Sequence, residues 1–145
     1  MKTIDIIETN IDDMNPQIYS YVIDKLLENG ALDAYLTNII MKKGRPAMKL
    51  TALAKPEDTE KLSSIIFDET TSLGVRIYSA KRRILEREIQ EIDTKYGKIK
   101  VKVSKLGGEV KNVTPEFEDC RKAAEKHKVS LKKVFEAAKC RYNQA

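Results

Sequence analysis

The chain contains 145 residues, of which 41% are hydrophobic and 34% are charged, and its formal net charge is +5. This size fits one compact unit or two small subdomains that bury a core without disulfide or metal staples. No segment approaches the roughly 18 consecutive apolar residues that span a bilayer, and the first residues lack the pattern of a secretory signal. We therefore expect a soluble protein with no membrane partner.

The cysteine and histidine content limits the kinds of metal or catalytic site that the chain can form. Cys120 and Cys140 stand alone, which favours reduced thiols and a cytoplasmic location over a disulfide framework or a zinc site. His127 is the only histidine, so an imidazole cluster or a Ser-His-Asp triad is excluded within one chain. The positive net charge favours anionic partners, although an ordinary solvated surface explains it as well.

The chain opens with a predicted strand and helix. Residues 3–10 form an apolar run that is typical of a strand covered on both faces. In the helix that follows, we expect Asn15 to cap the first turn, Pro16 to occupy the first helical position and Gly30 to close the end.

Two β-prone runs, 34–41 and 47–54, come next, and the short stretch between them has the turn residues of a hairpin. A second helix begins near Pro56, and a fourth strand follows Gly74. The resulting order, β-α-β-β-α-β, is that of the ferredoxin-like fold.

The remainder of the chain has a different pattern. Residues 84–92 and 98–103 alternate polar and apolar side chains around a turn, which predicts a second hairpin. We expect Thr114 and Pro115 to open a helix next, and Ser130 to cap a last helix. The predicted fold class is therefore α+β, with a ferredoxin-like subdomain at 1–85 and a smaller subdomain of a β-hairpin and two helices at 86–145, together one compact domain.

An acidic run follows the first predicted strand. Glu8, Asp12 and Asp13 supply carboxylate oxygens, which are the ligands that Mg²⁺ and Mn²⁺ prefer. The junction between a strand and a helix is a common place for a ligand crevice, although that rule belongs to doubly wound sheets. The two aspartates also fit a structural role at the positive end of the next helix.

A basic run lies between the two hairpin strands. Lys42, Lys43 and Arg45 flank Gly44, which allows close backbone approach, and arginine can bind phosphate through two parallel N–H bonds. Basic residues at a hairpin tip are equally typical of plain surface. The combination of acidic and basic runs at strand ends indicates a site for a metal-bound nucleotide.

Alternation along the neighbouring strands adds two cations to this prediction. If Leu50 faces the core, Lys49 lies on the opposite face of the sheet, and Arg76 and Tyr78 do the same on the fourth strand. Thr70 and Thr71, just before that strand, can bind phosphate, ribose or metal-bound water, or can simply satisfy their own loop.

A second set of cations has a simpler interpretation. Lys98, Lys100 and Lys102 alternate with Ile99, Val101 and Val103, so they line one face of a single strand. A solvated sheet face is the favoured explanation.

Several ordered motifs together resemble one family. They are the segments 8–16, 30–34, 41–46, 69–76 and 96–98 with 115–120. In this order they resemble the C-terminal region of LarC, the nickel-insertion protein or cyclometallase of nickel-pincer cofactor biosynthesis. The similarity runs nearly from end to end of the chain, which makes it more specific than any single motif.

The resemblance implies a lyase-class activity, in which nickel is inserted into pyridinium bisthiocarboxylic acid mononucleotide while CTP is cleaved to CMP and pyrophosphate with Mn²⁺ or Mg²⁺. It implies that this region binds the metal-bound CTP and assembles into a homo-oligomer, a trimer or a hexamer. Carried onto matching positions, it makes Glu8, Asp12 and Asp13 metal ligands, and it makes Lys42, Lys43, Arg45, Lys49, Thr70, Thr71 and Arg76 nucleotide-binding residues.

Members of the family also carry an N-terminal region with a histidine-rich segment suited to nickel. We therefore expect that region as a partner, and we expect the isolated domain not to be fully active alone. Two alternatives stay open, namely a basic RNA-binding module and a structural oligomerisation domain. Against the first, the strands lack paired aromatic residues for base stacking, with only Tyr78 suitably placed, so no nucleic acid partner is expected.

Overall fold

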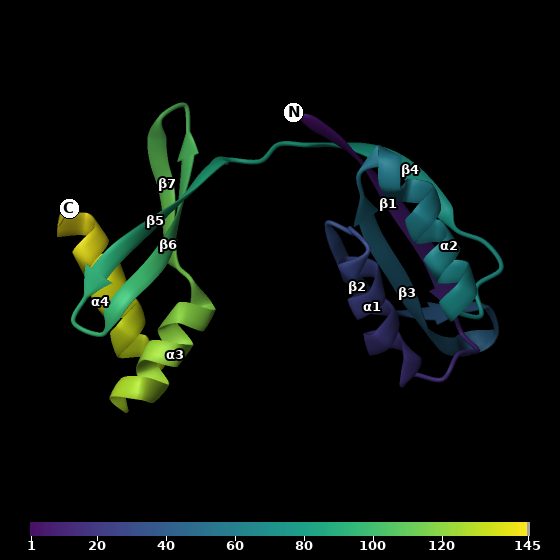
Figure 1. Ribbon diagram of the computed structural model, residues 1–145. Helices are drawn as coiled ribbons and strands as arrows, with labels where there is room; N and C mark the ends of the chain where they lie inside the picture. The colour runs from purple at the N-terminus through teal and green to yellow at the C-terminus, as the bar shows by residue number, and fades with distance from the viewer. Residues whose placement is uncertain (145) are drawn as a thin grey trace. The chain divides into compact units, whose positions relative to one another are not determined.

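The computed structural model describes residues 1–144 and separates into two compact units, the first of Met1–Arg83 and the second beginning at Ile84 (Figure 1). The first unit contains, in chain order, β1 (Lys2–Ile11), α1 (Ile18–Glu28), β2 (Asp33–Met41), the 3-10 turn η1 (Lys42–Gly44), β3 (Arg45–Ala54), the 3-10 turn η2 (Pro56–Asp58), α2 (Thr59–Glu69) and β4 (Arg76–Arg82). Within residues 1–144, no helix has the length and apolarity needed to cross a bilayer.

The first unit confirms the ferredoxin-like prediction. Its four strands pair antiparallel in the order β2-β3-β1-β4, and α1 and α2 pack on the same face of the sheet (Figure 1). The core between them is built from fully buried aliphatic side chains of all these elements. Its members include Ile7, Val22, Leu26, Leu50, Ala52, Leu62 and Ile66.

The sequence signals at the two ends of α1 are met only in part. Pro16, expected as the first helical residue, lies in the turn before the helix, and the residue that flanks the helix is Gln17. The Asn15 carboxamide oxygen accepts the backbone N–H of Gln17 at 3.0 Å, and regular helix begins at Ile18. At the other end Gly30 adopts a φ of +102°, which a residue with a side chain rarely tolerates, and Ala31 donates to the Leu26 carbonyl at 3.0 Å.

The other face of this sheet carries no helix of the unit, and we call it the open face. Strand register defines its members, because residues that face each other across antiparallel strands point to the same side. They include Glu8 and Asn10 on β1, Lys49 and Thr51 on β3, Tyr35 and Thr37 on β2, and Arg76 and Tyr78 on β4. The predicted alternation that puts Lys49, Arg76 and Tyr78 opposite the core is thus confirmed.

The second unit consists of β5 (Glu86–Thr94), β6 (Gly97–Leu106), β7 (Glu109–Pro115), α3 (Phe117–His127) and α4 (Leu131–Gln144). The three strands pair antiparallel in chain order, and the two helices share a small core with the inner side of β6 (Figure 1). The second hairpin and the two helices were predicted. The Ser130 hydroxyl accepts the backbone N–H of Lys133 at 3.4 Å, as expected of a cap.

Strand β7 was not predicted. Thr114 and Pro115 end this strand and do not open a helix, which begins at Phe117. Gly107 and Gly108 form the tight turn that sends β7 back along β6, with φ values of +57° and +83°. Proline is tolerated here because β7 is an edge strand and Pro115 is its last residue.

Candidate functional site

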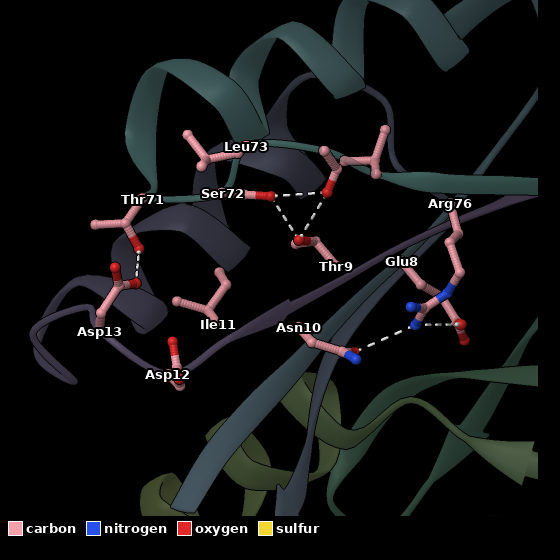
Figure 2. A pocket seen from close by; sticks show the side chains of 12 residues that line it. Glu8, Thr9, Asn10, Ile11, Asp12, Asp13, Thr71, Ser72, Leu73 and Arg76 are labelled. Carbon is pink, nitrogen blue, oxygen red and sulfur yellow. Dashed lines mark hydrogen bonds and ion pairs between the residues drawn. The ribbon is translucent and has the colours of Figure 1, made fainter. Parts of the chain in front are cut away.

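A pocket forms where β1 extends beyond the end of its neighbour β4. Pairing between the two strands stops at Glu8 and Arg76, whereas β1 continues to Ile11. The segment between α2 and β4 passes beside this unpaired end and encloses a hollow of about 390 Å³ (Figure 2). Its lining residues are Glu8, Thr9, Asn10, Ile11, Asp12 and Asp13 from the acidic run, and Thr71, Ser72, Leu73, Gly74, Val75 and Arg76 from the hydroxyl-rich run.

A buried threonine of β1 forms hydrogen bonds to the loop on the other side of the pocket. Thr9 is only 3% exposed, and its hydroxyl donates to the Gly74 carbonyl at 3.0 Å and contacts the Ser72 hydroxyl at 2.5 Å (Figure 2). Thr70 closes the loop on itself, since its hydroxyl donates to the Ile66 carbonyl at 2.6 Å and accepts the Ser72 N–H at 3.1 Å. The loop therefore holds a defined shape against β1.

The two aspartates reach different partners. Arg45 donates to the Asp12 carboxylate at 3.2 Å. The Thr71 hydroxyl donates to Asp13 at 2.6 Å (Figure 2). Both contacts join segments that are distant in the sequence. The acidic run thus meets the basic run on one side and the hydroxyl-rich loop on the other.

Glu8 lies at the centre of a second group of contacts on the open face. One carboxylate oxygen accepts from Lys49 at 3.1 Å and from the Tyr78 hydroxyl at 3.2 Å, and the other lies 3.5 Å from Arg76. Burial alone would raise the pKa of Glu8, but the hydrogen bonds from Lys49 and Tyr78 and the charge of Lys49 outweigh it and lower the pKa. Glu8 is therefore firmly ionised at neutral pH.

Two of the predicted nucleotide-binding residues stand apart from these contacts. Lys42 and Lys43 form the exposed turn between β2 and β3, where Lys43 adopts a φ of +63°. Within residues 1–144 neither side chain makes an ion pair. The turn places them next to Arg45 in the chain, and Arg45 is the member of the basic run that contacts the acidic one.

The structure adds residues that the sequence interpretation missed. Asn10 and Ser72 line the pocket, and Tyr35 shares the open face with Tyr78. The expectation that only Tyr78 is suitably placed on the sheet is therefore wrong. The signal was available, because alternation around the inward-facing Ala34 also predicts an outward Tyr35.

The donors suit a hard divalent cation that shares its ligands with a bound anion. Carboxylate and hydroxyl oxygens line the pocket, but nowhere within residues 1–144 do three His, Cys, Asp or Glu side chains gather as a closed metal cage. Mg²⁺ and Mn²⁺ commonly take one or two carboxylates and complete their shell with water and phosphate oxygens. The residues present fit that arrangement.

Comparison with known proteins identifies a family whose sequences match this chain. The family described as "Nickel insertion protein" matches residues 1–135. A pyridinium-3,5-bisthiocarboxylic acid mononucleotide nickel insertion protein of Acetivibrio thermocellus is 53% identical over 90% of the chain, and one of Thermotoga petrophila is 43% identical over 91%. The chain spans 32% and 33% of the length of these two relatives.

Two solved structures share the fold. One is described as LarC2, the C-terminal domain of a cyclometallase involved in the synthesis of the NPN cofactor of lactate racemase. It matches with a TM-score of 0.92 and 36% identity, and the match covers 98% of each chain. Protein MK0293 from Methanopyrus kandleri matches with a TM-score of 0.72 and 25% identity, over 92% of this chain and 82% of that one.

Proposed function

The chain belongs to the LarC family of nickel insertion proteins, in which it corresponds to the C-terminal domain, and we propose that it is the CTP-binding domain of a nickel insertase. In this proposal the complete enzyme inserts nickel, as a substrate, into pyridinium bisthiocarboxylic acid mononucleotide and cleaves CTP to CMP and pyrophosphate. The N-terminal region of the family, a trimeric or hexameric assembly and a cytoplasmic location are part of the same proposal.

One observation carries the proposal for this chain. The acidic run, the basic run and the hydroxyl-rich loop lie far apart in the sequence, and yet Asp12 contacts Arg45 and Asp13 contacts Thr71, while both aspartates line a single pocket. A triphosphate with its metal needs both kinds of group, namely oxygens for the cation and cationic donors for the phosphates. Folding supplies both within a few ångströms of each other.

The proposed roles follow from these positions. Asp12 and Asp13 would hold Mg²⁺ or Mn²⁺, which supplies charge neutralisation for the triphosphate when it is bound. Glu8 lies four residues before Asp12, roughly 13 Å away along the extended strand, so a metal-binding role for it would need a separate cation. Arg45, Lys49 and the turn lysines Lys42 and Lys43 would neutralise the nucleotide's negative charge, as would Arg76. Thr71 would offer its hydroxyl to the nucleotide, and Thr70 would hold the loop that carries Thr71.

The contacts of Glu8 make its role conditional on an exchange. Its oxygens already accept from Lys49, Tyr78 and Arg76. A metal cation can therefore bind Glu8 only if it displaces one of these donors from the carboxylate. Lys49, which contacts one carboxylate oxygen of Glu8, would then turn to the phosphates, while Arg76 would keep its contacts with the other oxygen and with Asn10. Such an exchange keeps every carboxylate and every cation paired, which limits its energetic cost.

Isothermal titration of the chain with CTP and Mn²⁺ tests the proposal. We expect saturable binding, and Arg45→Ala should weaken it by about tenfold or more, since hydrogen bonds to charged groups contribute about 1.5 to 3 kcal/mol. The thermal midpoint should scarcely move, because the ion pair of Arg45 with Asp12 is exposed. Lys100→Ala, on the sheet of the second unit, is the matched control and should bind CTP like the parent. Heat no larger than that of dilution for the parent protein would contradict the proposal.

RNA binding remains a second candidate because of the open face. Tyr35 and Tyr78 are 44% and 48% exposed and share that face with Lys49 and Arg76, a combination that suits stacked bases and phosphates. Titration with a single-stranded oligonucleotide at several salt concentrations separates the two functions. A steep loss of affinity with salt and no preference for free CTP would favour RNA.

A further inference from the structure

Asn10 lies on β1 between the carboxylates of Glu8 and Asp12. It is exposed on the open face, opposite Lys49 in the register of β1 and β3, and it lines the pocket. Its carboxamide oxygen accepts from an Arg76 guanidinium nitrogen at 3.2 Å (Figure 2). Its carboxamide nitrogen makes no hydrogen bond to any other group within residues 1–144.

Arg76 fixes which way this amide points. An asparagine can usually rotate its amide by half a turn and exchange its donor with its acceptor, and only the hydrogen-bond network decides between the two. Here the rotated amide would aim its NH₂ group at a guanidinium, which has donors and no acceptor. The same Arg76 nitrogen also lies 3.5 Å from Glu8, which holds the guanidinium in place.

A fixed amide offers one acceptor beside one donor in a set order. We propose that Asn10, oriented by Arg76, reads the base of the bound nucleotide and selects bases that carry an amino group next to an unprotonated ring nitrogen. This inference rests on the proposed function, because it concerns the nucleotide of the same pocket. The amide oxygen, which has a second lone pair, accepts from the amino group, and the amide NH₂ donates to the ring nitrogen.

The chemistry of the bases makes the selection specific. Cytosine and adenine both present an amino donor beside a ring-nitrogen acceptor, so both match the fixed amide. On their Watson–Crick edges, uracil and guanine present a carbonyl beside a ring N–H, and these edges match only the rotated amide, which Arg76 disfavours. Asparagine pairs with adenine in this bidentate way when proteins read DNA, and a good pair of this kind gives about 1 to 3 kcal/mol of discrimination.

The position of Asn10 is compatible with phosphates at the other end of the pocket. Residues two apart on a strand are roughly 7 Å apart, so Asp12 and the proposed cation lie one nucleoside length or less from Asn10. Tyr78 donates to Glu8 near Asn10, and its half-exposed ring offers a flat surface on which a base can stack. The base and the triphosphate therefore have separate groups to contact.

The test is the ratio of affinities for CTP and UTP, measured by titration with Mn²⁺ for the parent chain and for variants. We expect the parent to prefer CTP by about tenfold or more, and ATP over GTP in the same sense. Asn10→Ala should bring the CTP to UTP ratio close to one. Asn10→Asp keeps the shape but removes the donor, and Arg76→Gln releases the amide, so each should also lower the ratio. Asn112→Ala, an exposed asparagine of β7, is the control and should leave the ratio unchanged.

The outcomes separate the inference from the proposed function. If CTP binds but the ratio is the same in Asn10→Ala, Asn10→Asp and the parent, the reading role of Asn10 is wrong and the proposed function stands. If the parent binds CTP and UTP equally, the inference also fails while nucleotide binding stands. If the parent binds no nucleotide, both fail. An unchanged thermal midpoint in Asn10→Asp ensures that a lost preference is not a loss of folding.

Discussion

The two units of the chain each carry charges on a sheet face turned away from helices, but the charges are arranged differently. In the first unit Glu8 contacts Lys49 and Arg76, which are 41 and 68 positions away in the sequence. In the second unit Lys98 pairs with Glu91 at 3.3 Å across one hairpin, and Lys102 pairs with the nearby Glu116 at 2.7 Å. Convergence over long sequence distances marks the candidate site, whereas local pairing marks a solvated face.

Exposure of the side chains supports the same distinction. The side chains of Glu8 and Lys49 are 12% and 29% exposed, while those of Glu91 and Lys98 are 50% and 68% exposed. Ion pairs on an exposed surface contribute about 0 to 1 kcal/mol, because water and salt screen them. The contacts of Glu8 with Lys49 should therefore stabilise the first unit, whereas the exposed pair of Glu91 and Lys98 should contribute little to the second.

The largest expected effect tests the core that supports the candidate site. Leu50 is fully buried beneath the sheet beside Ile7, so Leu50→Ala should lower the free energy of unfolding by about 2 to 5 kcal/mol. Hydrogen exchange of the amides in β1 and β3 measures the loss. Leu73→Ala makes the same change at a fully exposed loop position and should stay within about 0.5 kcal/mol of the parent. Equal losses in both variants would mean that Leu50 does not support the sheet.

A change of one lysine in each unit tests the comparison directly. Lys49→Met removes a hydrogen bond to the nearly buried Glu8 carboxylate and should destabilise the first unit by about 1 to 3 kcal/mol. Lys100→Met removes an exposed charge from the second sheet and should have almost no effect. Urea denaturation of both variants gives the two numbers. A loss for Lys100→Met as large as that for Lys49→Met would abolish the distinction between the two faces.

The contact between Thr9 and the loop comes next in size. Thr9→Val keeps the volume but removes the two contacts that tie the loop to β1, so that the Ser72 hydroxyl and the Gly74 carbonyl keep only their bond to each other, at a cost of about 1 kcal/mol. We expect faster hydrogen exchange in the loop 70–75 and little change in α1. Thr37→Val, at an exposed position of the open face, is the matched control. Unchanged exchange in Thr9→Val would show that the loop is held by other contacts.

Local patterns predicted the first unit because each of its elements carries its own signal. Asn15 and Gly30 mark the ends of α1, and the alternation around Leu50 gives the two faces of β3. Strand β7 was not predicted because Lys111, Asn112 and Thr114 are polar and its only aliphatic residues are two valines. Its structure depends on its pairing with β6. Local propensity cannot report such tertiary pairing.

The candidate site shows the same limit at the level of side chains. Composition indicated that Glu8 and Lys49 take part, but only strand register shows that they contact each other. The contact of Asn10 with Arg76 likewise depends on where β4 begins relative to β1. Residue types could therefore be predicted from the sequence, and their partners could not.

The smallest expected effect concerns two glutamates whose pKa values are both lowered. Burial opposes ionisation of Glu8, but hydrogen bonds from Lys49 and Tyr78 outweigh it, whereas a hydrogen bond from Arg121 lowers the pKa of the exposed Glu118. A glutamate with a lowered pKa stabilises the fold above its pKa in the unfolded chain, and that stabilisation is lost as the pH falls through the folded value. Both contributions should therefore disappear in acid, below the ordinary value of 4.5.

High salt should distinguish the pKa values of Glu8 and Glu118. At 1 M salt the screening length is only about 3 Å, and screening acts chiefly on exposed charges. We expect the pKa of Glu118, whose side chain is 61% exposed, to return towards its ordinary value, and that of Glu8, at 12%, to stay low. Carboxyl titration by NMR at low and high salt measures both groups in one sample, with Lys49→Met as the variant in which the pKa of Glu8 should rise. If salt moves the pKa of Glu8 as far as that of Glu118, the contacts around Glu8 are ordinary surface pairs. The case for a pre-arranged anion and cation site on the open face then fails with them.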